Sequence, residues 1–128
     1  MIQRRKRVIL IGVFLTFLLC LLGCGNEDKY VAMVKTGNLQ IEPNIEVGKA
    51  FDEFFVHPKW ESFESDDHKR VVEFNGDCTW DDKPAKCTIQ FVINNDTEFE
   101  VVYVAINDVS INLEDGMEIV RKALTNKD

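Results

Sequence analysis

Apolar and polar residues alternate along two segments in the second half of the chain. Residues 71–80 place Phe74 and Cys78 on one side, and residues 86–93 place Cys87 and Phe91 on one side in the same way. The residues between them, Asp-Asp-Lys-Pro, are typical of a turn. The pattern predicts a β-hairpin, and we expect a four-residue loop because proline cannot donate a backbone hydrogen bond.

Two further strands are predicted beside this hairpin. Residues 59–64 precede a turn and read as the first arm of another hairpin, while residues 98–106 follow a tight turn at Asn94. Residues 98–106 are apolar on both faces, as in strands that are covered on both sides. We therefore expect residues 31–34, or a partner, to supply the second cover.

Helical spacing of apolar residues marks the two ends of this strand region. The stripe that includes Phe51 predicts a helix from Pro43 to about Phe55, and Asn112 is expected to cap a helix that runs to about Thr125. The predicted fold class is α+β. It comprises an N-terminal helix, an antiparallel four-stranded meander and a C-terminal helix, with the helices packed on one side of the sheet.

The beginning of the chain has the composition of a secretory signal peptide. Basic residues 4–7 precede the apolar residues 8–22, and the small residue Gly23 precedes Cys24. The alternative is an uncleaved membrane anchor. The apolar run is shorter than the ~20 residues that a spanning helix needs, and polar residues follow it directly.

The ending Leu21-Leu22-Gly23-Cys24 resembles the lipobox of bacterial lipoproteins. The resemblance implies cleavage before Cys24 and a diacylglyceryl group on Cys24, often with a further acyl chain such as palmitate. Two or more acyl chains hold a protein stably at a membrane. We expect a removed signal peptide at 1–23, a lipid-anchored tether and lead-in at 24–37, and one α+β domain at 38–128. The implied location is the extracytoplasmic side of the cell membrane or the outer membrane.

The chain from Cys24 onward is strongly acidic. Residues 1–23 hold four basic and no acidic side chains, so the remaining 105 residues carry 11 basic and 22 acidic side chains and a net charge of −11. Such a surface repels the phosphates of nucleic acid, so no nucleic-acid partner is expected. It suits a basic protein partner, and it equally suits a role in solubility alone.

The four cysteines divide into three groups. Cys20 lies inside the apolar run, Cys24 is the implied lipid acceptor, and Cys78 and Cys87 remain as a pair. A four-residue loop at 81–84 would place Cys78 directly opposite Cys87, so a cross-strand disulfide is predicted, as is common outside the cytoplasm. Buried free thiols and a redox or metal site are the alternatives, although neither a CxxC spacing nor a neighbouring histidine supports the last.

Three segments resemble a module of bacterial lipoproteins and membrane-tethered zinc-ribbon proteins that has no assigned activity. They are Val47-Gly48-Lys49-Ala50-Phe51, Trp60-Glu61-Ser62-Phe63 and Val71-Val72-Glu73-Phe74-Asn75-Gly76. The order of helix, loop and meander is also similar in architecture to the small lipoprotein of the outer-membrane barrel assembly machinery and to the β-lactamase-inhibitor fold. Architecture alone does not carry function.

The sequence contains no catalytic signature, whether GxSxG, HExxH, P-loop or dinucleotide-binding glycine pattern. We expect no catalytic residue, no metal site and no cofactor. The hypothesis is a membrane-anchored protein-binding module that is not an enzyme and acts as an assembly partner or an enzyme inhibitor. The alternative is a small-ligand carrier, or an enzyme, with an unrecognised pocket.

Overall fold

The structure is a computed structural model that describes residues 28–126. The predicted signal peptide and Cys24 lie outside the described residues. Within residues 28–126, no helix is both long enough and apolar enough to cross a membrane.

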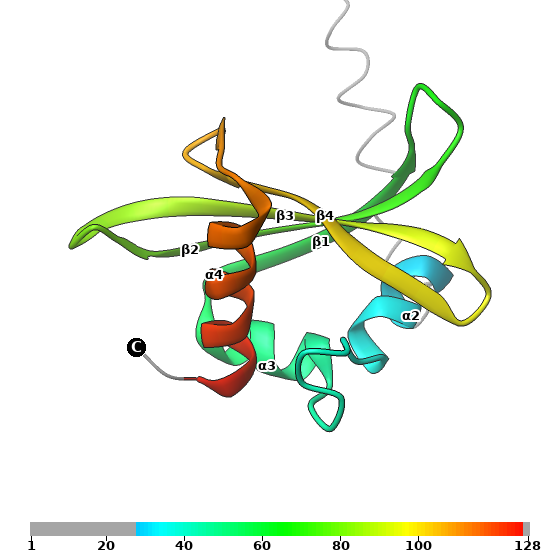
Figure 1. The fold of residues 1–128 in the computed structure, drawn as a ribbon, viewed down its shortest axis with the longest axis horizontal. Helices are drawn as coiled ribbons and strands as arrows, with labels where there is room; N and C mark the ends of the chain where they lie inside the picture. The colour runs from blue at the N-terminus through cyan, green and yellow to red at the C-terminus, as the bar shows by residue number, and fades with distance from the viewer. Residues whose placement is uncertain (1–27, 127–128) are drawn as a thin grey trace, which may run out of the picture.

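The centre of the fold is one antiparallel sheet whose strands follow each other in chain order (Figure 1). The predicted α+β class and the antiparallel meander are confirmed, but the meander has a fifth, two-residue strand that was not predicted. The strands are β1 (Val56–Glu64), β2 (Arg70–Trp80), β3 (Lys83–Asn95), β4 (Glu98–Ile106) and β5 (Val109–Ser110).

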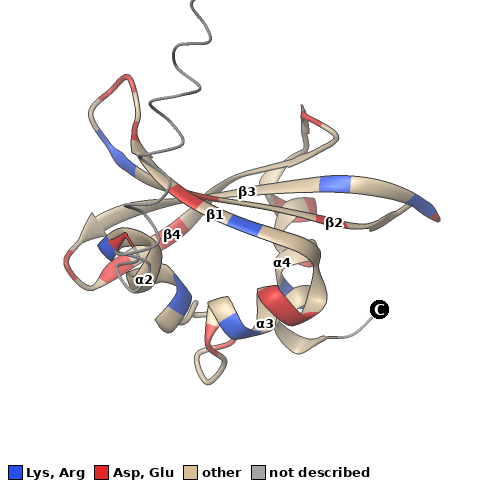
Figure 2. Ribbon diagram, turned by 180° about the vertical axis from the view of Figure 1, so that it is seen from behind, with Lys and Arg blue, Asp and Glu red and all other residues tan. Residues whose placement is uncertain are grey.

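Three helices, α2 (Lys29–Thr36), α3 (Val47–Phe54) and α4 (Leu113–Thr125), lie on the same side of the sheet (Figures 1 and 2). The packing of helices on one side was predicted, but for two helices and not for three. Asn112 caps α4, its side chain accepting a hydrogen bond from the Asp115 amide at 2.8 Å. Helix α3 begins at Val47 and not at Pro43, because residues 39–45 form turns in front of it.

Helix α2 occupies the segment that was expected to be a lead-in. Asp28 caps it by accepting hydrogen bonds from the amides of Tyr30 and Val31 at 2.8 and 3.1 Å. Val31 and Val34 are buried in the same core as the sheet and the other helices. The packed domain therefore includes residues before position 38.

Aromatic rings fill the space between α3 and the sheet. The Phe51 ring is fully buried, and its centroid lies 5.0 Å from that of Phe74 on β2 and 6.1 Å from that of Phe91 on β3. Trp60 on β1 stacks on Phe51 with a centroid distance of 5.9 Å. These contacts hold the helix layer against one face of the sheet, and none of the described helices lies on the other face.

The predicted four-residue loop between β2 and β3 is wrong. Trp80 pairs with Lys83, so the turn contains only Asp81 and Asp82, whose φ angles of 55° and 63° are those of a type I′ turn. The missing N–H of Pro84 was expected to disfavour a two-residue turn. Pro84 pairs with Thr79, next to the pair that closes the turn, where a strand residue donates no hydrogen bond across the ladder.

The shorter turn also corrects the pairing of the cysteines. Cys78 lies opposite Ala85, and Cys87 lies opposite Gly76, so the two cysteines are diagonal neighbours on the helix side. Both are free thiols in this structure, and the directly opposed pair that supported the disulfide prediction is not formed.

Candidate functional site

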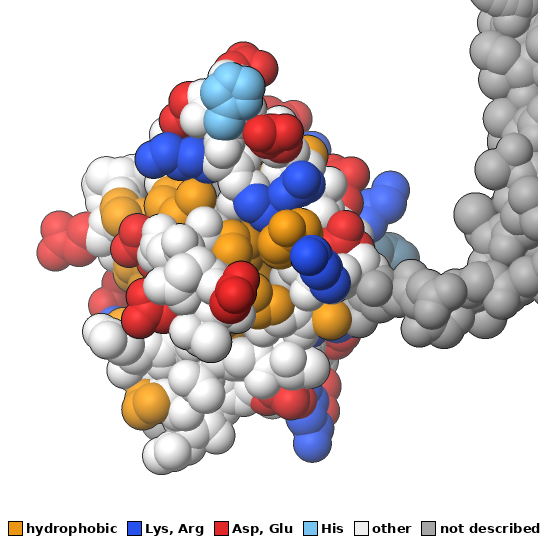
Figure 3. Space-filling view, turned by 90° about the vertical axis from the view of Figure 1, so that its right-hand side faces the viewer, with side chains coloured by type: hydrophobic (Ala, Val, Ile, Leu, Met, Phe, Trp, Pro, Cys, Tyr) orange, Lys and Arg blue, Asp and Glu red, His pale blue; other side chains and the backbone are white. Residues whose placement is uncertain are grey.

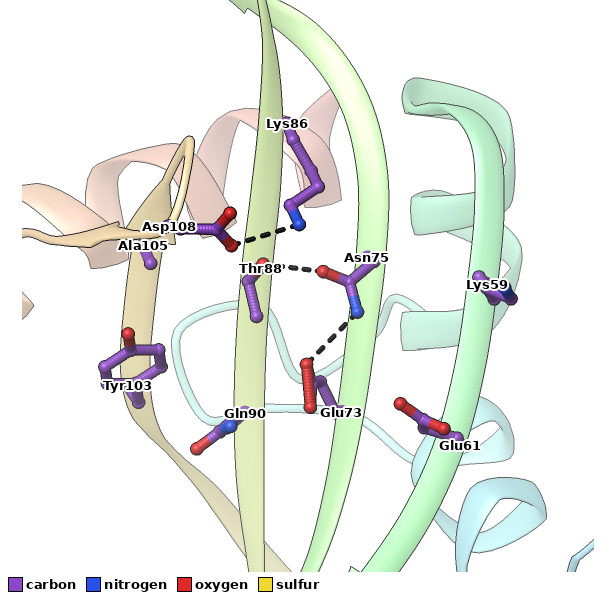
Figure 4. Close-up of a pocket in the computed structure, with 10 residues that line it drawn as sticks. All are labelled: Lys59, Glu61, Glu73, Asn75, Lys86, Thr88, Gln90, Tyr103, Ala105 and Asp108. Atoms are coloured by element: carbon purple, nitrogen blue, oxygen red, sulfur yellow. Dashed lines mark hydrogen bonds and ion pairs between the residues drawn. The ribbon is translucent and has the colours of Figure 1, made fainter. Parts of the chain in front are cut away.

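The helix-free face of the sheet is a candidate site. The β1–β2 and β4–β5 hairpins rise from the sheet on the side away from the helices (Figures 1 and 2). Between them lies a hollow of about 580 Å³, which we call the open face (Figure 4). It is lined by Lys59, Glu61, Glu73, Asn75, Lys86, Thr88, Gln90, Tyr103, Ala105 and Asp108.

Period-two alternation explains why these side chains share one face. Phe74 on β2 and Ile89 on β3 point to the helices, so their neighbours Glu73 and Gln90 point the other way. Glu73 pairs directly with Gln90, and Gln90 pairs with Tyr103 of β4. A row of three polar side chains therefore crosses three strands at the middle of the open face.

Hydrogen bonds fix the positions of several of these groups. The Thr88 hydroxyl, which is only 6% exposed, donates to the Asn75 side-chain oxygen at 2.6 Å, and Asn75 Nδ2 donates to Glu73 Oε2 at 3.2 Å (Figure 4). At the edge of the hollow, Lys86 Nζ lies 3.0 Å from an oxygen of Asp108. The Glu73 carboxylate is thus oriented before any partner arrives.

Two like charges face each other on this surface. Glu61 of β1 is directly opposite Glu73 of β2, and neither carboxylate forms an ion pair with another described residue. Like charges at directly opposed positions destabilise a strand pair. The lining of the open face also includes Lys59, so it carries one more acidic than basic side chain, an excess that a cationic group from outside could neutralise.

Apolar residues continue the same face beyond the hollow. Val71 and Val92 are cross-strand partners on the helix-free side, and both are buried although neither belongs to the main core cluster. Figure 3 shows apolar side chains bordered by charged ones on the side where the β1–β2 and β3–β4 hairpins end. A mixed surface of this kind is typical of protein interfaces.

The cysteine pair lies on the opposite side of the sheet from the open face. Cys78 is half-buried and Cys87 is fully buried. A hydrogen bond from Cys87 lowers the pKa of the Cys78 thiol, while the same bond and burial raise the pKa of the Cys87 thiol. Cys78 is therefore the thiol of the pair that ionises first and meets a reagent first.

The two histidines are exposed and lie apart from each other, His57 at the register shift in β1 and His68 in the turn between β1 and β2. His57 Nδ1 is 2.9 Å from Asp77 Oδ2, and His68 Nδ1 is 3.4 Å from Glu64 Oε2. No group of three or more histidine, cysteine, aspartate or glutamate residues among the described residues could hold a metal ion.

Sequence reasoning missed the open face. The alternation at 71–80 and 86–93 showed that polar residues share a side of the sheet. The hollow depends on the upturned hairpins, and the opposition of Glu61 and Glu73 depends on the register between β1 and β2. Neither could be read from the alternation alone.

Comparison of the chain with protein-family models, with curated proteins and with solved structures finds no match.

Proposed function

We propose that this chain is a membrane-anchored extracytoplasmic lipoprotein that binds a protein partner through the open face and performs no catalysis. The observation that supports the proposal most is the hollow, helix-free sheet face on which Glu61 and Glu73 oppose each other without a cationic partner. The opposition of Glu61 and Glu73 destabilises the free protein, but a positive charge from a bound partner would compensate for it. The acidic chain favours a basic partner, whether an assembly component or an inhibited enzyme.

The test is a pull-down from solubilised envelope of the native host with the chain from Cys24, carrying Cys24→Ser so that it bears no lipid. We expect one stoichiometric partner that is released by salt, because exposed charge pairs are screened. Glu61→Gln with Glu73→Gln should reduce capture. The control, Glu46→Gln at the N-cap of α3 with Glu53→Gln on its exposed surface, removes the same charge and should not. A small molecule that raises the melting temperature, with no protein captured, would instead favour a ligand carrier or enzyme.

We also propose that the exported protein carries a Cys78–Cys87 disulfide after oxidation. Diagonal neighbours on paired strands are about 7–8 Å apart, so the hairpin must shift slightly to bring the sulfur atoms together. This arm can move, because β2 has no β1 partner beyond Asp77 and β3 has no β4 partner before Cys87. The Cys78 thiolate would attack the disulfide of an exported oxidoreductase and form a mixed disulfide with it. The Cys87 thiolate would then attack the Cys78 sulfur of that mixed disulfide and release the oxidoreductase as a reduced dithiol.

Intact-mass analysis of the exported protein, without reductant and after alkylation, tests this disulfide. We expect a mass lower than that of the dithiol by two hydrogen atoms, with no alkylation of Cys78 or Cys87. A short loop closed in this way should contribute about 2–3 kcal/mol to the free energy of unfolding. Two alkylatable thiols in exported protein would show that the pair serves only as the packed thiols seen in this structure.

A further inference from the structure

The outer edge of β4 is open over most of its length. β5 pairs only with Ala105 and Ile106 of β4, and the Ile111 amide donates to the Val104 carbonyl at 3.0 Å. From Glu98 to Tyr103, β4 is paired with β3 on one side and with no described strand on the other. An edge of this length presents unpaired backbone donors and acceptors to an incoming strand.

The opposite edge of the sheet is protected in the ways that natural edges usually are. β1 contains Pro58, and the ladder to β2 shifts register between Val56 and Lys59 around His57, whose φ is +56°. Proline and bulges of this kind discourage strand addition. β4 also has a bulge, at Val102, but from Glu98 to Tyr103 it contains no proline and no residue with a positive φ angle. The two edges therefore differ, and β4 is the better suited to pairing.

A groove lined by both apolar and polar residues runs along the open edge of β4 on the side of the helices. Its volume is about 540 Å³, and we call it the β4 groove. The exposed side chain of Leu113 at the start of α4 borders it, with 45% of its surface accessible. Its other apolar lining residues are Leu39, Ile41, Phe99, Val101 and Met117.

The charged residues along this edge are both acidic. Glu98 and Glu100 are exposed, and they are the charged residues that border the β4 groove. Phe99 packs edge-on against Phe91 in the core, so the alternation of β4 turns Glu98 and Glu100 toward the helix-free side. One side of the edge is thus apolar and the other is negative.

We propose that the β4 edge from Glu98 to Tyr103 adds an extended segment of the protein partner as a further antiparallel or parallel strand. The side chains of that segment alternate between apolar residues, which enter the β4 groove, and lysine or arginine, which face Glu98 and Glu100. Strand addition takes its affinity from backbone hydrogen bonds and its specificity from alternate side chains. The inference rests on the proposed protein-binding function and names the chemistry of the partner segment.

The test uses a blocked seven-residue peptide of alternating valine and lysine, and a matched peptide with glutamate in place of lysine. Amide hydrogen exchange of the chain from Cys24, carrying Cys24→Ser, is followed with each peptide. We expect the lysine peptide to slow exchange at alternate amides between Glu98 and Tyr103 at least about fivefold, because added ladder hydrogen bonds protect them. The amides of β1 should not change.

Charge reversal supplies the matched variants. Glu98→Lys with Glu100→Lys should weaken the lysine peptide about tenfold or more and create binding of the glutamate peptide. Glu46→Lys with Glu53→Lys on α3 changes the net charge equally and should leave the affinity unchanged. Both pairs are exposed, so neither substitution disturbs the core.

Three results would overturn the inference. They are unchanged exchange at the β4 edge, equal binding of both peptides, and equal loss of affinity in the α3 control. The proposed function would survive each of them if the envelope partner is still captured and still depends on Glu61 and Glu73. If no envelope partner is captured but the lysine peptide still protects the β4 amides, the proposed function fails and the β4 inference stands. The two proposals can therefore fail separately.

Discussion

Gly116 is the residue at which α4 approaches β4 most closely. A Cβ atom at this position would lie 2.7 Å from both Cβ and Cγ2 of Val104, which is itself buried. Alanine would favour the helix by about 1 kcal/mol, but overpacking a core contact costs about 1–3 kcal/mol. We predict that Gly116→Ala lowers the free energy of unfolding, measured by urea denaturation, by up to about 2 kcal/mol. The cost should shrink in a Val104→Ala background, and a stabilised Gly116→Ala variant would contradict the packing described here.

Asp28 combines a helix cap with a link to the sheet. Besides capping α2, its carboxylate accepts a hydrogen bond from the Ser62 hydroxyl of β1 at 2.8 Å. Partial burial raises the pKa of this carboxyl, but the hydrogen bonds from Ser62 and from the amides of Val31 and Tyr30, with the nearby Arg70 charge, outweigh it and lower the pKa below its ordinary 3.8.

A lowered pKa in the folded protein means that Asp28 stabilises the fold above pH 3.8, and that this contribution disappears as the pH falls through the folded pKa. We predict that Asp28→Ala costs about 1 kcal/mol at pH 7, the usual value of a lost cap. The difference from the unmodified protein should narrow in urea unfolding curves below pH 3.8. Asp28→Asn retains a capping oxygen and should lose less at pH 7. A difference that does not change with pH would contradict the role of the charge.

At the scale of elements, the β2–β3 turn holds two aspartates in backbone conformations that favour glycine or asparagine. Asp81 and Asp82 both adopt positive φ angles, which aspartate tolerates and glycine adopts without cost. We predict that replacing Asp81-Asp82 by Asn-Gly raises the free energy of unfolding by about 0.5–1 kcal/mol.

The β4–β5 turn offers a matched comparison. Asn107 and Asp108 also have positive φ angles, of 52° and 68°, but Asp108 is paired with Lys86. Asp108→Gly should therefore gain less stability than Asp82→Gly in the β2–β3 turn, because Asp108→Gly removes that ion pair. Thermal and urea unfolding of the two variants measure the difference. A loss of stability at Asp82 would show that the turn is not of the type described.

The elements that could be predicted are those whose own residues carry the signal. Alternation placed Val72 and Phe74 on the helix side, and Asn112 marked the start of α4. The register of the hairpin could not be predicted in the same way. Asp-Asp occurs in several turn types, and the argument from Pro84 assumed that its nitrogen would face β2. A slip of one residue in each arm was enough to separate Cys78 from Cys87.

At the scale of the whole molecule, the sheet separates a packed side from an available side. The helices and the ring cluster around Phe51 stabilise one face, so the other face is free to carry residues that do not stabilise the fold. The sequence predicted that β4 would be covered on both sides, whereas the structure shows cover by a helix on one side. α4 covers one side of β4, and Val102, at a bulge, remains 45% exposed. Among the described residues, no helix covers the other side of β4, and Val31 and Val34, which were expected there, are buried in the core on the helix side. The partner segment that we propose would pair with the neighbouring edge of the strand.

The proposed lipid anchor decides where these surfaces operate. Only four residues lead from Cys24 to Asp28, the cap of α2, and an extended chain spans at most about 3.6 Å per residue. With lipid on Cys24, α2 would lie within about 15 Å of the anchor point, so the partner must be reached close to the membrane.

We predict that Cys24→Ala abolishes labelling by a radiolabelled fatty acid and leaves an uncleaved precursor in the host. Cys20→Ala is the matched control, since it removes a cysteine from the apolar run and should preserve both labelling and cleavage. Unchanged labelling of Cys24→Ala would reject the lipoprotein assignment, while the fold and the β4 edge would remain to be tested as a soluble binding domain.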